Sequence, residues 1–415
     1  MKKFIIKFTT KHRELILKLV PKKVILFCQN LVMSKGINDF ERVEDFNKDL
    51  KNGINVVGLL KTQSGLGQGA RLLLEAIRKS KYDSAAICVD SGPNTTYDDI
   101  LTKEFPNKIN LLACQPSFSF ESMISQINID NLKGRYNIAY WLWELDKIPE
   151  EFKDSFKYVN EIWTSSNFVK EAFEKETDLP VKVIPYGINT KKNEKLTRKD
   201  FNIPEDKFVY LSMFSSKSSS ERKNPMAAID AFIKAFDNKD DDVFLVIKIN
   251  GSSKKDIDIL NEKLKGISNY MIIDEVLSQE DIYSLISLCD VFVSLHRSEG
   301  FGFPMAEAMS LGTVSIATNY SGNVDFMNKD NSCLVDYKIV PIELEDDLVY
   351  KKGNHWADPN IDEAADYMVK LYKDKKYYNK LKENAKKYIE ENLSMKNSSK
   401  IIEKRIDEII KENNF

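Results

Sequence analysis

The stretch that decides the fold is residues 290–312, DVFVSLHRSEGFGFPMAEAMSLG. Its apolar run at residues 291–295 predicts a short buried strand. Pro304 predicts a helix that opens soon afterwards, because proline fits the first helical position, where its missing N–H is not needed. Gly300 and Gly302 lie in the turn between, where glycine lets the backbone come close to a ligand. The segment therefore predicts a strand–turn–helix unit whose helix N-terminus favours an anion.

Two carboxylates bracket this turn. Glu299 follows the strand, and Glu307 lies about one helical turn after the helix start. Amides at the turn suit phosphate oxygens, and carboxylates suit the hydroxyls of a sugar or ribose, so the pattern indicates a nucleotide-sugar site. The alternative is a surface carboxylate and a helix-start carboxylate that the helix dipole favours.

The Glu-x7-Glu spacing with an internal Gly-Phe-Gly also resembles the donor-binding motif of the retaining, family-4-type glycosyltransferases, the glycosyl transferases group 1, which have the GT-B fold. In that family the first glutamate contacts the donor sugar and the second holds the ribose. The resemblance implies these roles for Glu299, as a catalytic residue, and for Glu307. It further implies that the donor sugar and diphosphate face the backbone of Gly300, Phe301, Gly302 and Phe303.

Composition limits the class of protein. A chain of 415 residues is long for one domain and suggests two or three. Its 42% hydrophobic and 30% charged residues are typical of a soluble globular protein, and the net charge of -2 gives no general attraction for nucleic acid. Three scattered histidines and five unpatterned cysteines predict a reducing compartment and no metal site. The acidic runs at residues 240–242 and 345–347 are interpreted as solvated loop charge rather than a metal-binding Asp-x-Asp.

Residues 1–36 form a basic extension, in which nine positive residues against one negative residue give +8. Apolar residues recur in it at helical spacing, which predicts an amphipathic helix. Such a helix either contacts an anionic membrane surface or packs on the protein with its lysines in water. No run of 18 apolar residues occurs, so we expect no membrane span and no export. The expected location is the cytoplasm, on the inner face of the membrane if the extension binds lipid.

After this extension, apolar runs alternate with helical patterns, which predicts two mostly parallel sheets with helices on both faces. Two Rossmann-like, doubly wound domains facing across a cleft are the GT-B architecture that the resemblance implies. The expected division is an extension and linker at 1–50, an acceptor domain at 51–195, a donor domain at 196–392, and a helix at 393–415 that packs back on the first domain. Local predictions include a helix at 149–159, a turn at 355–359 and a helix at 361–392.

A glycine-rich loop, Gly65-Leu-Gly67-Gln-Gly69, follows the first predicted strand and opens the first helix. Because a helix N-terminus behind glycines favours an anion, the loop is a candidate phosphate site. By resemblance Gly67 faces the donor phosphate and Gly65 the acceptor. The rival interpretation is an NAD-type dinucleotide fingerprint with Asp90 at the end of the next strand, although its order of glycines and its tight turn are not matched.

Polar loops after the second-domain strands supply further candidates. The family commonly has an arginine soon after the first of these strands and a lysine at the next helix start. Lys223, just before Pro225, matches the lysine and would act as a second catalytic residue by stabilising the departing diphosphate. The arginine is absent, with Lys217 as a substitute. By resemblance the loop with Val276 and Leu277 lines the nucleobase pocket.

Trp143 and Glu144 end another first-domain strand, where ligands collect in open α/β sheets, and are assigned to the acceptor side. Together these features predict a retaining glycosyltransferase that moves a sugar from a UDP- or GDP-linked donor to a hydroxyl of a glycan or lipid-linked acceptor in cell-surface polysaccharide assembly. No metal or further cofactor is expected, and by resemblance the leaving phosphate accepts the acceptor proton. Alternatives are an epimerase or phosphorylase on the same fold, a non-catalytic nucleotide-sugar-binding protein, and a dinucleotide oxidoreductase.

Overall fold

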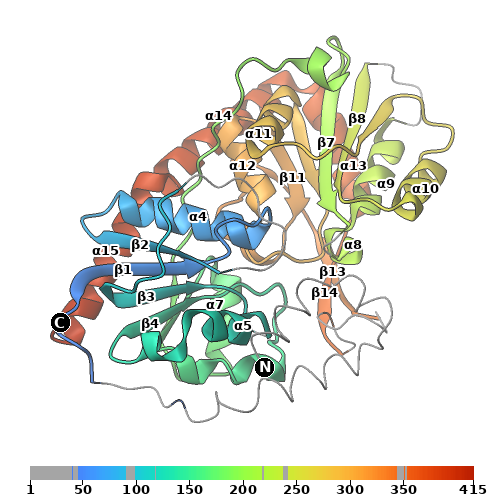
Figure 1. The fold of residues 1–415 in the computed structure, drawn as a ribbon. Helices are drawn as coiled ribbons and strands as arrows, with labels where there is room; N and C mark the ends of the chain where they lie inside the picture. Colours follow the sequence, from blue (N-terminus) through green and yellow to red (C-terminus); the bar gives the residue numbers. More distant parts are fainter. Residues whose placement is uncertain are drawn as a thin grey trace.

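The computed structural model describes residue 40 and residues 45–89, 99–116, 118–216, 219–236, 242–343, 350 and 353–415. These residues form two α/β units, one above the other in Figure 1, which we call the first and the second domain. The basic extension of residues 1–36 lies outside the described residues together with its predicted membrane contact, as do Asp90, Lys217 and residues 345–347.

The first domain is built on a six-stranded sheet. Its strands are β1 Lys51–Gly58, β2 Asp83–Cys88, β3 Asn107–Ala113, β4 Tyr136–Tyr140, β5 Glu161–Thr164 and β6 Val181–Val183. In the described part of the chain they are all parallel, in the order β2-β1-β3-β4-β5-β6. Both faces are covered, because successive residues such as Leu111 and Leu112 belong to different apolar clusters. Strands buried on both faces appear in a sequence as continuous apolar runs, which makes them predictable.

The helices of this domain connect the parallel strands. They are α4 Gly65–Arg78, α5 Phe118–Ile127, α6 Glu150–Lys153 and α7 Asn167–Glu174, with the short 3-10 helices η1 Ile129–Leu132 and η2 Phe156–Tyr158. The helix predicted at 149–159 was wrong in its extent, because α6 and η2 are separate short turns. Ser64 caps α4, since its hydroxyl oxygen accepts a hydrogen bond from the Gly67 N–H at 3.2 Å.

The second domain repeats the arrangement. Its parallel strands are β7 Phe208–Ser215, β8 Val243–Asn250, β9 Tyr270–Ile273, β10 Val291–Ser294, β11 Val314–Thr318 and β12 Cys333–Val335, in the order β12-β11-β10-β7-β8-β9. Its helices are α8 Ser220–Lys223, α9 Pro225–Phe236, α10 Lys254–Lys263, α11 Gln279–Leu288, α12 Phe303–Leu311, α13 Ile361–Lys373 and α14 Lys375–Asn392, with η3 Arg198–Phe201 and η4 Ser321–Asp325. Two antiparallel strands, β13 Tyr337–Pro341 and β14 His355–Pro359, form an arm that extends toward the first domain (Figure 1).

Two local predictions for this domain were wrong. The turn expected at 355–359 is strand β14, because its backbone pairs with β13, a strand that the sequence pattern did not reveal. The single helix expected at 361–392 is two helices, α13 and α14. Asp374 separates them with non-helical backbone angles, and its carboxylate caps α14 by accepting from the Tyr377 N–H at 2.9 Å.

The last helix, α15 Met395–Glu412, leaves the second domain and packs along α4 of the first (Figure 1). Arg405 anchors it, because its guanidinium donates to both carboxylate oxygens of Glu161 at 2.9 and 2.6 Å. Glu161 is fully buried at the start of β5 and also accepts from Tyr136 and Trp163. Two parallel α/β domains joined by a C-terminal helix that crosses back confirm the predicted GT-B fold class.

Candidate active site

The strand–turn–helix unit lies where the two domains meet. Strand β10 ends at Ser294, and α12 begins at Phe303 with Gly302 as its N-cap. Gly302 has a φ of 101°, and a Cβ atom there would lie 2.5 Å from Cε of Met305. Only glycine takes this conformation without strain, so Gly302 sets the direction in which the α12 N-terminus points. Gly312 ends the helix in the same left-handed region, at a φ of 79°.

Glu299 is held by two cations at the strand end. It is only 7% exposed, and its Oε1 pairs with Nζ of Lys223 while its Oε2 lies 3.2 Å from Nη1 of Arg222. Burial alone would raise the pKa of Glu299, but the Lys223 and Arg222 charges outweigh it and lower the pKa to about 2. Glu299 is therefore a carboxylate at any physiological pH. Burial lowers the pKa of Lys223, although the Glu299 charge opposes that shift.

Arg222 joins the two domains at this cluster. It is 4% exposed, and its Nη1 donates to the Ser298 carbonyl at 2.6 Å. Its Nη2 lies 3.9 Å from Oε1 of Glu144 in the first domain, and its guanidinium carbon lies 5.6 Å from the centre of the Tyr350 ring. Burial opposes its charge, yet the neighbouring carboxylates raise its pKa above the ordinary value. Arg222 was not among the residues predicted for the site, and it lies beside Lys223 as a second cation on Glu299.

Glu307, in the second turn of α12, is held differently. It is 4% exposed, and its Oε1 accepts hydrogen bonds from the Gln68 side-chain amide and from the Tyr283 hydroxyl, the latter at 3.2 Å. Burial raises its pKa to about 7, while these two hydrogen bonds lower it. Gln68 belongs to α4 of the first domain, so this contact also spans the two domains.

Gly300 brings the two domains into direct contact. Its carbonyl oxygen accepts from the hydroxyls of Ser165 and Ser166 at 3.1 and 2.7 Å, and a Cβ atom on Gly300 would lie 3.0 Å from the Trp143 carbonyl oxygen. The sequence suggested glycine here for the approach of a ligand. The neighbours observed at this position are the segments that follow strands β4 and β5 of the first domain. Glu144 contributes as well, because its carbonyl accepts from the Ser298 hydroxyl.

The aromatic residues of the site pack against one another and against neighbouring rings. Phe301 is buried, and its ring contacts Tyr186 at a centroid distance of 5.3 Å; the Phe303 ring lies 4.7 Å from the same tyrosine. Trp143 is buried too, with its ring stacked on Tyr350 at 6.1 Å and its indole N–H donated to the Lys147 carbonyl. The Trp143 side chain therefore packs in the core, and a contact between this residue and an acceptor stays a prediction.

The glycine-rich segment predicted as a loop forms the start of α4, and its first two glycines differ in their surroundings. A Cβ atom on Gly67 would lie 2.2 Å from the Thr62 carbonyl oxygen, so this glycine is required by the loop's own turn. A Cβ atom on Gly65 would meet no atom within 4 Å, and Gly65 is exposed. Gly65 is thus the glycine of this loop that leaves open space in front of the helix.

The predicted nucleobase loop follows β9. Val276 is 80% exposed, which is unusual for a large apolar side chain, and Leu277 is half-buried. Leu277 lines a cavity of about 280 Å³ together with Asp274 and Asp281. An exposed valine beside a cavity suits a flat apolar ligand such as a base, but the contact stays a prediction.

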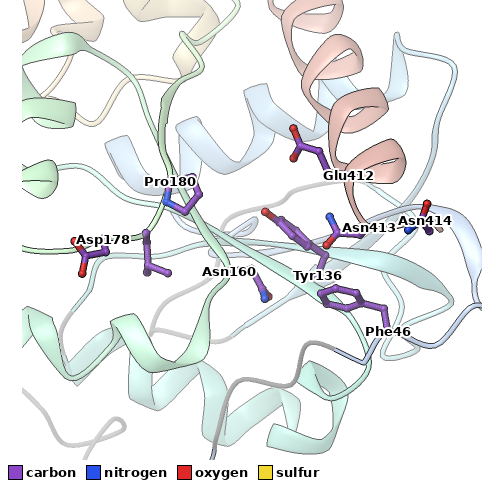
Figure 2. Close-up of a pocket in the computed structure, with 9 residues that line it drawn as sticks. Phe46, Tyr136, Asn160, Asp178, Pro180, Glu412, Asn413 and Asn414 are labelled. Atoms are coloured by element: carbon purple, nitrogen blue, oxygen red, sulfur yellow. The ribbon is translucent and has the colours of Figure 1, made fainter.

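A wider cavity of about 500 Å³ lies at the opposite edge of the first sheet (Figure 2). Tyr136 begins β4 there, and Asn160 and Pro180 precede β5 and β6, so this is the amino edge. Glu412 at the end of α15 closes one side of it. Ligands of open α/β sheets bind beyond the carboxyl ends of the strands, and we therefore place the candidate active site at the domain junction.

Two further observations concern the described residues. No group of three or more His, Cys, Asp or Glu side chains among them is arranged to hold a metal ion. None of their helices has the length and apolar character that crossing a bilayer requires.

Known proteins resemble this chain in sequence and in fold. Residues 193–388 match the profile of the family described as glycosyl transferases group 1. The O-antigen biosynthesis glycosyltransferase WclY of Escherichia coli is 30% identical over 157 residues, which cover 38% of this chain and 41% of that protein. The chain spans about half the length of the curated relatives it matches, 41% of WclY and 56% of a putative glycosyltransferase of a Sulfolobus islandicus filamentous virus.

Solved structures of other proteins share the fold. A glycosyltransferase from Rickettsia africae ESF-5 superposes with a TM-score of 0.64 at 16% identity, covering 87% of this chain and 99% of that chain. HepE of Anabaena in complex with UDP and glucose superposes with a TM-score of 0.60 at 12% identity, covering 86% and 100%. At these identities the likeness shows the fold alone.

Proposed function

Because this chain belongs, through its second domain, to the group 1 glycosyltransferases, we propose that it is a retaining glycosyltransferase that uses a nucleotide-diphosphate sugar. The acceptor is a hydroxyl of a glycan or lipid-linked glycan. The observation that carries the proposal is the pair of buried glutamates, Glu299 and Glu307, on either side of the α12 N-terminus.

The charges at the junction suit a donor diphosphate. Lys223 and Arg222 both lie against Glu299, and the N-terminus of α12 adds backbone N–H groups and the positive end of its dipole. A diphosphate bound here would take Lys223 as a partner in place of Glu299. Charge developing on the departing phosphate would then meet groups that are already oriented, which is the largest source of rate enhancement in many enzymes.

The ionisation of Glu299 restricts its role. A general base works best when its pKa lies near the working pH, and the pKa of Glu299 is about 2. It is too weak a base to take a proton from a hydroxyl, but it is a strong hydrogen-bond acceptor. We assign it to the donor sugar's hydroxyls. The acceptor's proton passes to the leaving phosphate, which leaves on the same face in a retaining transfer.

The setting of the reaction is part of the proposal. The relative from Escherichia coli carries the name O-antigen biosynthesis glycosyltransferase, which supports a growing glycan as the acceptor. HepE was solved with UDP and glucose, which supports a UDP-linked donor, with GDP as the alternative. The contact between residues 1–36 and an anionic membrane stays a prediction from the sequence.

Calorimetric titration tests the donor site. UDP, GDP, ADP and NAD are titrated into the wild type, Glu307→Ala and Glu383→Ala, the last being an exposed control on α14. We expect one nucleoside diphosphate to bind the wild type and the control, and to bind Glu307→Ala at least tenfold more weakly. Binding of NAD that is insensitive to Glu307→Ala would overturn the proposal in favour of dinucleotide chemistry at the Gly65 loop.

Product analysis tests the reaction. The matching nucleotide sugar is incubated with protein and oligosaccharide acceptors, and the new linkage is assigned by NMR. An α-linked product from an α-linked donor agrees with retention. A β-linked product would contradict it, and conversion of the donor only by water or free phosphate would favour an epimerase or a phosphorylase.

A further inference from the structure

The carboxylate of Glu307 is shared between the domains. Gln68 reaches it from α4 of the first domain, and Tyr283 reaches it from α11 of the second. The Gln68 amide nitrogen also lies 3.2 Å from the Tyr283 hydroxyl oxygen, so the three side chains form a closed triangle. Gln68 and Glu307 are 239 positions apart in the sequence, and their contact depends on how the domains sit against each other.

The triangle uses one side of the carboxylate. Both hydrogen bonds end on Oε1, and among the described residues none ends on Oε2. A carboxylate offers about four acceptor positions over its two oxygens. Fixing Oε1 from two directions therefore fixes the orientation of Oε2, and leaves it available for hydroxyl groups of a ligand.

We propose that Gln68 is a positioning residue of the donor site, which holds the Glu307 carboxylate from the first domain so that Oε2 faces the ribose hydroxyls. This inference rests on the proposed function, in which Glu307 binds the ribose. It adds that ribose recognition is completed only when the two domains are in contact.

The side chain of Gln68 meets the physical requirements of this role. A neutral amide donates to the carboxylate without neutralising it, unlike the two cations that hold Glu299. Tyr283 cannot fix the carboxylate alone, because one hydrogen bond allows rotation about its axis. The second bond, from another direction, prevents that rotation. A donor with a ribose would thus bind more tightly to the closed arrangement than to an open one, which couples donor binding to domain contact.

Nucleotide pairs that differ only in the ribose test the proposal. UDP and GDP, each beside its 2′-deoxy counterpart, are titrated into the wild type, Gln68→Ala and Gln68→Glu. Gln63→Ala is the matched control, because Gln63 is an exposed glutamine in the loop just before α4. Thermal unfolding of each protein establishes that the variants are folded.

We expect Gln68→Ala to weaken the binding of the ribonucleotide about tenfold, as for loss of a hydrogen bond to a charged group. The ratio of ribo to deoxyribo affinity should fall toward one. Gln68→Glu keeps the size of the side chain but replaces the donor by a second carboxylate, so it should bind more weakly than Gln68→Ala. The Gln63→Ala control should match the wild type in both affinity and ratio.

Three results would overturn the inference. An unchanged ribo to deoxyribo ratio in a folded Gln68→Ala protein would show that Gln68 does not act on ribose recognition. Tighter binding by Gln68→Ala would show that Gln68 competes with the ribose for Glu307. Neither result bears on the proposed donor site itself, which the weaker binding expected for Glu307→Ala tests separately. If the wild type binds none of these nucleotides, the proposed function fails and the inference fails with it.

Discussion

Glu307 is a buried carboxylate that should reduce the stability of the protein at neutral and alkaline pH. It is 4% exposed and has no cation among the causes that set its pKa. Burial raises that pKa from 4.5 to about 7, and the hydrogen bonds from Gln68 and Tyr283 offset only part of the rise. We expect that replacing the carboxylate by its neutral isostere, in Glu307→Gln, stabilises the fold and removes nucleotide binding.

The magnitude follows from the shift. The difference between 7 and 4.5 is 2.5 units, and each unit corresponds to 1.36 kcal/mol, so ionised Glu307 costs about 3 kcal/mol. Below pH 4.5 the group is protonated in both the folded and the unfolded chain, and it has no effect. Between pH 4.5 and 7 the folded protein retains a proton that the unfolded chain has lost. Stability therefore falls as pH rises through this window, and the full cost is present above it.

The measurement is urea unfolding at pH 5 and at pH 8. At pH 8 we expect Glu307→Gln to be more stable than the wild type by about 3 kcal/mol, and at pH 5 by less than 1 kcal/mol. The amide oxygen of the new glutamine can take the position of Oε1 and accept from both Gln68 and Tyr283, with its NH2 group at the position of Oε2, so Gln68 and Tyr283 keep their acceptor. Glu383→Gln, on the exposed face of α14, is the control and should leave stability unchanged at both pH values.

Two outcomes would refute this reasoning. An equal stability difference at pH 5 and pH 8 would mean that the titration of Glu307 does not contribute. A Glu307→Gln protein that is less stable than the wild type at pH 8 would mean that the carboxylate has a favourable partner that outweighs its burial.

Three further perturbations test the packing of the site. Arg222→Met leaves Glu299 buried with one cation, and should cost about 3 kcal/mol in urea unfolding at pH 7. The pKa of Glu299 falls from 4.5 in the unfolded chain to about 2 in the folded protein, so this cost should fade as pH falls below 4.5. A cost that grows in acid would contradict the pairing of Arg222 with Glu299. Arg405→Met leaves the fully buried Glu161 without its cation, so the free energy of unfolding should fall by about 3 kcal/mol and α15 should detach at a lower temperature. Adding Glu161→Gln to the same protein should restore part of that stability. Gly300→Ala puts a Cβ atom 3.0 Å from the backbone of the first domain, which should push the two domains slightly apart. We expect the transfer rate in a steady-state assay to fall about tenfold while thermal unfolding changes little. Full activity would show that the junction tolerates this shift of the domains.

The fold was largely predictable because its signals are local. Helices α9 and α11 have the bounds that the periodic pattern predicts, since Pro225 opens one and Ser278 caps the other. The unit around residues 290–312 was predicted for the same reason, because a buried strand, a left-handed glycine and a helix start lie in one stretch. Strands β13 and β14 were missed, because their pairing joins segments whose own patterns are weak.

The site was only half predictable. Glu299, Glu307 and Lys223 belong to recognisable patterns, whereas Arg222 and Gln68 do not. Arg222 stands next to Lys223 in the sequence, and nothing local distinguishes it from a solvated arginine. What distinguishes it is its burial against Glu299, which lies 77 positions away in the sequence. Gln68 lies between Gly67 and Gly69, and these glycines are enough to account for a glycine-rich helix start without any role for the glutamine. The role proposed for it depends on a contact with the other domain, which no local pattern contains.

In the proposed function, the cations at this junction change their anionic partner when the donor binds. Lys223 and Arg222 are packed against the buried Glu299, whose charge already offsets part of their desolvation within the folded protein. A donor diphosphate that reaches Lys223 exchanges one anionic partner for another and leaves Arg222 to hold Glu299 in place. Binding then costs little new desolvation, and Glu299, still ionised, is released on its Oε1 side to accept hydroxyls from the sugar. In the proposed function, the observed pairing between Lys223 and Glu299 prepares both residues for the donor.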